Sequence, residues 1–143
     1  MAFDIVQQLN SRQQEMQTLF GYYVSFNYLQ TTKYPMLVDF HTHGLDLFGH
    51  EDIQIVCDVG PDKTLVVMDK LMKRIRQGTF VKSGDTLLRF FNHAPAHFVR
   101  GVDHEGRNVT RIIIPDSEGN YMQDTIADNY RYQFITDLRE VLP

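Results

Sequence analysis

Side chains that bind metals and transfer protons gather between positions 38 and 51. The ligand-binding site predicted from them consists of Asp39, His41, His43, His50 and Glu51. The first three alternate along the chain. Because alternate side chains of a β-strand lie on the same face, we expect them to form one row. A turn at Gly49 would allow the last two to fold back beside that row.

Two kinds of function are open to such a row. In the first, which we favour, the row lines the groove of a non-catalytic module that binds a small molecule or a protein and needs no cofactor. In the second, His41, His43 and His50 hold a metal ion, because imidazole nitrogen is a ligand of zinc, iron and manganese. Glu51 or Asp39 would then remove a proton from metal-bound water, which would make the protein a small metal-dependent hydrolase.

The Asp-x-His-x-His pattern itself resembles the strand that opens amidohydrolase barrels and phosphoesterases of the PHP type. Those enzymes are built on barrels of roughly 200 residues or more. A chain of 143 residues is too short for such a barrel. The resemblance therefore does not extend beyond this strand.

The remaining candidate residues have structural interpretations. We expect His93 and His97 to lie in a surface loop, because Pro95 between them disfavours a helix. His104 falls in the predicted hairpin turn 103–106, where we expect it to be solvated. Cys57 lies among apolar residues and is expected to be a buried thiol. Motifs for a nucleophilic serine, a phosphate-binding loop or a dinucleotide site do not occur in the sequence.

Composition narrows the class of protein. The net charge is −4, and the 14 Lys and Arg residues are scattered, which argues against a nucleic-acid partner. No apolar run approaches the length of a membrane span, and a single cysteine excludes an internal disulfide. The sequence therefore predicts a soluble cytoplasmic protein with one domain over residues 1–143.

The residue pattern predicts alternating helices and strands. Helices are expected over 3–19 and from Pro61 to Gly78, with Pro at the first helical position and cations in the last turns. Strands are expected over 22–29, 36–43, 53–59, 86–91, 97–102 and 108–114, with a short strand and a helical turn after 130. This order predicts an α+β fold, a single compact domain whose mostly antiparallel sheet is accompanied by an N-terminal helix and one central amphipathic helix. The edges of such a sheet favour pairing into a homo-oligomer.

Several short segments, in order, resemble a bacterial family known only as a domain of unknown function. The segments are His41-Thr-His-Gly-Leu45, Phe48-Gly-His-Glu51, Gly84-Asp85 and Ile114-Pro115-Asp116 with Gly119, within residues 21–134. The resemblance implies a small α+β cytoplasmic protein of bacteria without an established activity. The family's shared turn falls on residues 49–51, whereas His41 stands where the family usually has an aromatic residue.

That turn also has a structural interpretation. Leu45, Leu47 and Phe48 would pack into the core, and His50 and Glu51 would form hydrogen bonds with backbone groups to hold the loop closed. The structural and the binding interpretations are compatible, because ligand sites often lie on loops that a rigid scaffold holds in place.

Overall fold

The computed structural model describes residues 21–29, 31 and 33–142. The helix expected over 3–19 lies outside the described residues.

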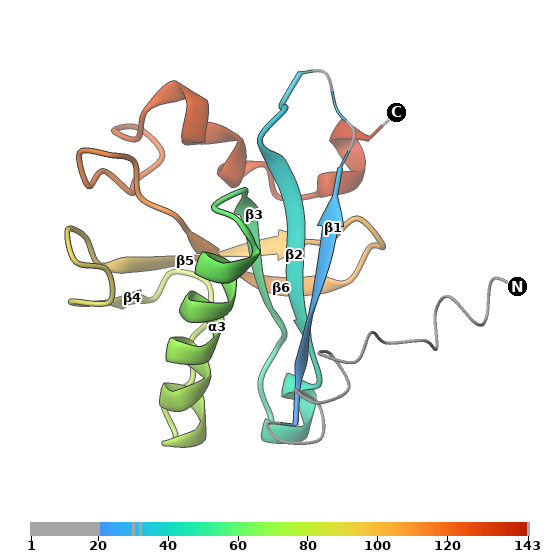
Figure 1. Cartoon of the computed structure of the whole chain (residues 1–143), viewed down its shortest axis with the longest axis vertical. Coiled ribbons are helices and arrows are strands. Elements are labelled where there is room, and N and C mark those ends of the chain that lie inside the picture. Colours follow the sequence, from blue (N-terminus) through green and yellow to red (C-terminus); the bar gives the residue numbers. More distant parts are fainter. Residues whose placement is uncertain (1–20, 30, 32, 143) are drawn as a thin grey trace, which may run out of the picture.

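A six-stranded sheet forms the centre of the described chain (Figure 1). Its strands are β1 (Tyr23–Tyr28), β2 (Leu37–His43), β3 (Ile53–Cys57), β4 (Thr86–Leu87), β5 (Ala96–Val102) and β6 (Asn108–Ile113). They lie in the order β1-β2-β3-β6-β5-β4, in which β3 and β6 are parallel and all other neighbours antiparallel. This confirms the predicted α+β class and the mostly antiparallel sheet.

The central helix, α3 (Pro61–Arg76), begins where the sequence predicts and ends two residues before Gly78. Pro61 occupies its first turn, and the Thr64 hydroxyl donates a 2.8 Å hydrogen bond to the carbonyl of Gly60. One face of the helix is buried and consists of Thr64, Met68, Leu71, Met72 and Ile75. The basic residues near its end lie in the last turn, so they belong to a helix terminus that favours cations.

The two faces of the sheet differ in polarity. Phe40 of β2 pairs with Phe26 of β1 and Ile55 of β3, and these apolar side chains share the hydrophobic core with α3. The alternate positions carry polar side chains in paired register: Asn27 with Asp39, His41 with Gln54, and Gln54 with Arg111. Strand alternation therefore separates an apolar layer from a polar row, as expected for β2.

Three predicted strands differ from the structure by more than one residue at an end. The strand expected over 86–91 ends at Leu87, because Arg89 has a positive φ of 60° and Phe90 turns into the core, where it is 2% exposed. The strand expected over 53–59 ends at Cys57. The C-terminal segment forms the 3-10 helices η2 (Asp128–Phe134) and η3 (Leu138–Val141) rather than a strand, and a single bridge joins Asp137 to Val102.

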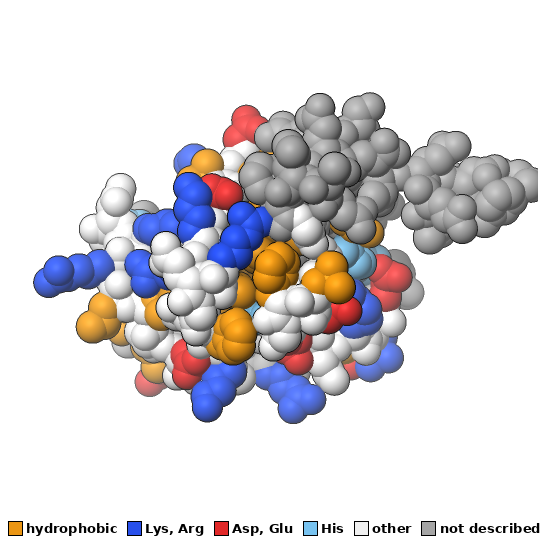
Figure 2. Space-filling model, turned by 90° about the horizontal axis from the view of Figure 1, so that it is seen from below, with side chains coloured by type: hydrophobic (Ala, Val, Ile, Leu, Met, Phe, Trp, Pro, Cys, Tyr) orange, Lys and Arg blue, Asp and Glu red, His pale blue; other side chains and the backbone are white. Residues whose placement is uncertain are grey.

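The C-terminal turns lie at one end of β2, and the short 3-10 helix η1 (Leu45–Phe48) lies at the other (Figure 1). On the face in Figure 2, the described basic side chains (blue) are spread over the surface, with acidic ones (red) among them. None of the helices in the described part of the chain is both long enough and apolar enough to span a membrane.

Candidate functional site

Asp39 is the centre of a buried group of ionisable side chains. Its carboxylate is fully buried, and each oxygen accepts hydrogen bonds from two donors. His41 Nδ1 and the side-chain amide of Gln54 contact Oδ1 at 2.8 Å each. The backbone N–H of His104 donates to Oδ2 at 2.9 Å, and His104 Nδ1 contacts the same oxygen. Although burial opposes ionisation, these hydrogen bonds and the charge of His41 hold the pKa of Asp39 well below its usual value.

His41 connects Asp39 to His43. With Nδ1 against the carboxylate, the other ring nitrogen, Nε2, lies 3.0 Å from Nε2 of His43, so one of the two nitrogens donates a proton and the other accepts it. His41 is fully buried, whereas His43 is half-buried and stacks on Tyr23 with ring centroids 4.9 Å apart. Burial and the neighbouring His41 lower the pKa of His43.

His104 joins this group from the turn between β5 and β6. The expectation that it is solvated is wrong, because its side chain is 24% exposed and its ring contacts Asp39. Asp103 shapes the turn by accepting hydrogen bonds from the backbone N–H groups of Glu105 and Arg107 at 2.9 and 2.8 Å. The hairpin itself was predicted, but its approach to β2 was not.

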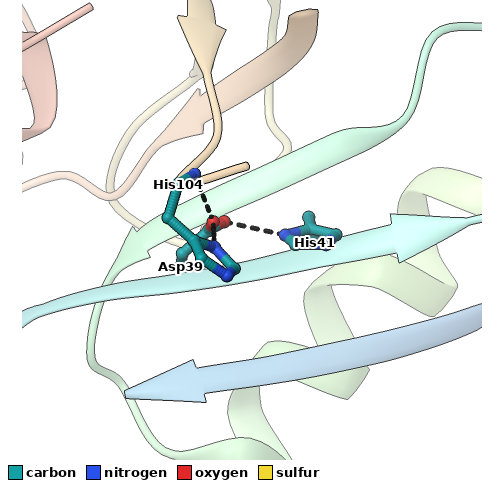
Figure 3. A group of neighbouring side chains, drawn as sticks. All are labelled: Asp39, His41 and His104. Carbon is teal, nitrogen blue, oxygen red and sulfur yellow. Dashed lines mark hydrogen bonds and ion pairs between the residues drawn. The ribbon is translucent and has the colours of Figure 1, made fainter. Parts of the chain in front are cut away.

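These contacts define a group that we call the Asp39 cluster: Asp39, His41, His43 and His104. In the described part of the chain, Asp39, His41 and His104 are the one set of three or more His, Cys, Asp or Glu residues with possible ligand atoms all within 4.8 Å of one another. Figure 3 shows the two histidine rings on either side of the Asp39 carboxylate, with His41 beside it on β2 and His104 reaching it from a separate loop.

A second buried network of hydrogen bonds holds the cluster in place. Gln54, which donates to Asp39, accepts a 2.7 Å hydrogen bond from Nε of Arg111. The Arg111 guanidinium is fully buried and also donates to backbone carbonyls of the C-terminal segment, those of Gln133 at 2.7 Å, Thr136 at 3.1 Å and Ile135. Burial lowers the pKa of Arg111 to about 10, and the charge of Asp39 opposes that shift.

Gly101 of β5 leaves the room that Arg111 and Gln54 occupy. A Cβ at this position would lie 2.8 Å from Arg111 Nη2 and 2.8 Å from Gln54 Oε1, closer than real Cβ contacts allow. The absence of a side chain at Gly101 therefore permits the hydrogen bonds that hold Asp39 in place.

His50 and Glu51 do not join the Asp39 cluster. His50 Nδ1–H donates a 2.6 Å hydrogen bond to the Glu51 carbonyl, and Nε2 accepts one of 3.0 Å from the Val81 backbone N–H. The Glu51 carboxylate instead accepts a 3.0 Å hydrogen bond from the Thr110 hydroxyl. The structural interpretation of this turn is thus confirmed for His50, and Leu45 is buried as expected, but Leu47 is 77% exposed rather than packed in the core.

The other predicted positions have local partners. His93 Nε2–H donates to the Asp116 carbonyl at 3.3 Å, and His97 Nδ1 lies 3.3 Å from the Thr86 hydroxyl. Cys57 is buried, as predicted, and burial raises the pKa of its thiol. None of these three takes part in the Asp39 cluster.

Sequence reasoning missed His104, Gln54 and Arg111. Arg111 does leave a signal, because it is a charged residue inside the apolar run from Val109 to Ile114 and such a charge must find a partner. Gln54 follows from the same argument once the register of β3 and β6 is known. His104 leaves no local signal, since 65 positions separate it from Asp39.

None of the family models, curated proteins or solved structures compared with the chain matches it. The geometry of the site is therefore the basis for a proposed function, and the resemblance to the bacterial family remains a prediction.

Proposed function

We propose that this protein is a non-catalytic binding module whose ligand is a divalent transition-metal ion held by Asp39, His41 and His104. The observation that carries the proposal is the convergence of one carboxylate and two imidazoles within 4.8 Å. The ion would take the place of the two protons that now join the imidazole Nδ1 atoms to the Asp39 carboxylate.

The donor set indicates the class of ion. Two imidazole nitrogens and one carboxylate oxygen suit zinc, iron or manganese, whereas calcium and magnesium prefer sites made of oxygen alone. The ligand atoms already contact one another, so binding an ion would require little rearrangement of the described chain.

The groups around the proposed ligands support them in the way that metal sites require. A ligating histidine usually directs its second ring nitrogen to a polar partner, and His41 directs Nε2 to His43. A ligating carboxylate is usually hydrogen-bonded as well, and Asp39 accepts from Gln54 and from the His104 backbone.

Two features favour binding over hydrolysis. Asp39 and His41 are fully buried, and His104, which is 24% exposed, is the ligand that faces solvent. This burial restricts the access of a substrate to the proposed ion. A hydrolase also needs a carboxylate with a free oxygen to act as base, but both Asp39 oxygens are occupied and Glu51 contacts Thr110 elsewhere.

The proposal is tested by competition for zinc between a chromophoric chelator and the untagged, metal-stripped protein. Wild-type protein should bind about one equivalent. His104→Ala should bind at least about tenfold more weakly, because it removes a ligand, and the loss of a group that only forms a hydrogen bond with a ligand already costs that much. His97→Ala is the matched control, because His97 lies outside the cluster. Equal zinc affinity in wild type and His104→Ala, with both proteins shown to be folded by circular dichroism, would refute the assignment.

A further inference from the structure

A charged cavity lies apart from the Asp39 cluster, beside the segment that follows α3. Its volume is about 290 Å³, and it is lined by Glu51, Val81, Lys82, Ser83, Arg100 and Thr110. Val81 and Thr110 are buried and form the floor, whereas the three charged side chains are exposed at the walls.

The walls of this cavity are fixed by backbone contacts. Arg100 and Thr110 are paired across β5 and β6. His50 joins the other two sides, because it bonds the Glu51 carbonyl through Nδ1 and the Val81 N–H through Nε2. The backbone around the cavity is thus held in place by the fold, which lowers the part of the entropic cost of binding that would come from ordering the chain.

The charged side chains that line the cavity lack oppositely charged partners in the described part of the chain. Among the described residues, Glu51, Lys82 and Arg100 form no ion pair, and the Glu51 carboxylate accepts one hydrogen bond, from Thr110. Two cations and one anion therefore face one small space. A ligand with two anionic groups and one cationic group would neutralise them all.

We infer that this cavity binds an acidic α-amino acid. Arg100 would bind one carboxylate through two parallel hydrogen bonds, Lys82 would bind the other, and Glu51 would accept hydrogen bonds from the ammonium group. The Ser83 hydroxyl adds a neutral donor or acceptor at the wall. This site is independent of the proposed metal ion, so either assignment can fail alone.

Isothermal titration calorimetry with L-glutamate and L-aspartate tests the inference. Binding of at least one of them is expected, together with at least about tenfold weaker binding of L-glutamine and of glutarate, which lack one carboxylate and the ammonium group, respectively. Absence of binding of both amino acids up to about 10 mM would overturn the inference, because any remaining affinity would be too weak for a specific site.

Variants of the exposed wall residues identify the groups responsible. Arg100→Gln should weaken binding of the amino acid at least about tenfold. Glu51→Gln retains an acceptor for Thr110 but should remove the preference for L-glutamate over glutarate. Arg131→Gln, at an exposed arginine of η2, is the matched control and should bind like wild type. Unchanged affinity in Arg100→Gln, or an unchanged preference in Glu51→Gln, would contradict the site.

Discussion

His41 and His50 are both buried histidines within the same short stretch, yet their surroundings differ in kind. Both ring nitrogens of His41 face ionisable side chains, Asp39 and His43. Both ring nitrogens of His50 face backbone groups, those of Glu51 and Val81. The proton between His41 and Asp39 lies between two groups that can both bind a metal ion, whereas one ring nitrogen of His50 is occupied by a backbone N–H, which offers no ligand atom. The hydrogen-bond partners of a histidine therefore indicate, more than its burial does, whether it can act as a metal ligand.

The largest effect is expected at the centre of the cluster. Asp39→Ala would leave the donors of His41, His104 and Gln54 without an acceptor and the buried Arg111 without a nearby anion. We expect a loss of about 3–5 kcal/mol in the free energy of unfolding, measured by urea denaturation of the metal-free protein. Asp46→Ala, at an exposed position of η1, is the control. A loss in Asp39→Ala no larger than in this control would mean that the network contributes no stability.

The next largest loss of stability is expected at Gly101, beside the Arg111 and Gln54 side chains that hold Asp39 in place. Gly101→Ala would place a Cβ against Arg111 and Gln54, and neither buried group can move without breaking hydrogen bonds. We expect destabilisation of about 2 kcal/mol, measured in the same way. Because the same network holds Asp39, a proposed zinc ligand, in place, zinc affinity should also fall. A free energy of unfolding equal to that of wild type would show that the strands can move apart at Gly101 and admit the methyl group without cost.

In the turn at residues 49–51, a substitution should lower stability without changing zinc affinity. His50→Ala would remove the partners of the Val81 N–H and the Glu51 carbonyl, at a cost of about 1–2 kcal/mol in stability. Zinc affinity should stay that of wild type, because His50 lies outside the cluster. The pair of His50→Ala and His41→Ala is therefore informative. A loss of zinc binding in both variants would erase the distinction drawn between the two histidines.

The smallest effect concerns pH. Because the pKa of Asp39 is lower in the folded than in the unfolded protein, its ionisation contributes stability that is complete above about pH 4 and is lost as pH falls toward the folded value. The advantage of wild type over Asp39→Asn, measured by urea denaturation with a chelator present, should therefore shrink between pH 6 and pH 3. An advantage that grows over this interval would contradict the ionised state of Asp39.

Local features of the fold could be predicted from the sequence. The boundaries of α3 follow from Pro61 and the cations of its last turn, and the β5–β6 hairpin follows from its turn residues. The row on β2 follows from alternation alone. Each of these features depends on residues close together in the chain, where propensity and periodicity are strong.

The composition of the site could be predicted only in part. Asp39, His41 and His43 lie together as expected, but His50 and Glu51 turn away because Val81 and Thr110 offer them partners. The approach of the β5–β6 turn to β2 depends on the order and twist of the whole sheet. Such a long-range contact cannot be predicted from the spacing of residues in the sequence.

Anomalous diffraction at the zinc absorption edge, from crystals of untagged protein loaded with zinc, would show whether the Asp39 cluster holds a metal ion. We expect an anomalous peak about 2.0–2.2 Å from an Asp39 carboxylate oxygen and from Nδ1 of both His41 and His104. A peak at His50, His93 or His97 with none in the Asp39 cluster would contradict it, as would the absence of any ordered zinc.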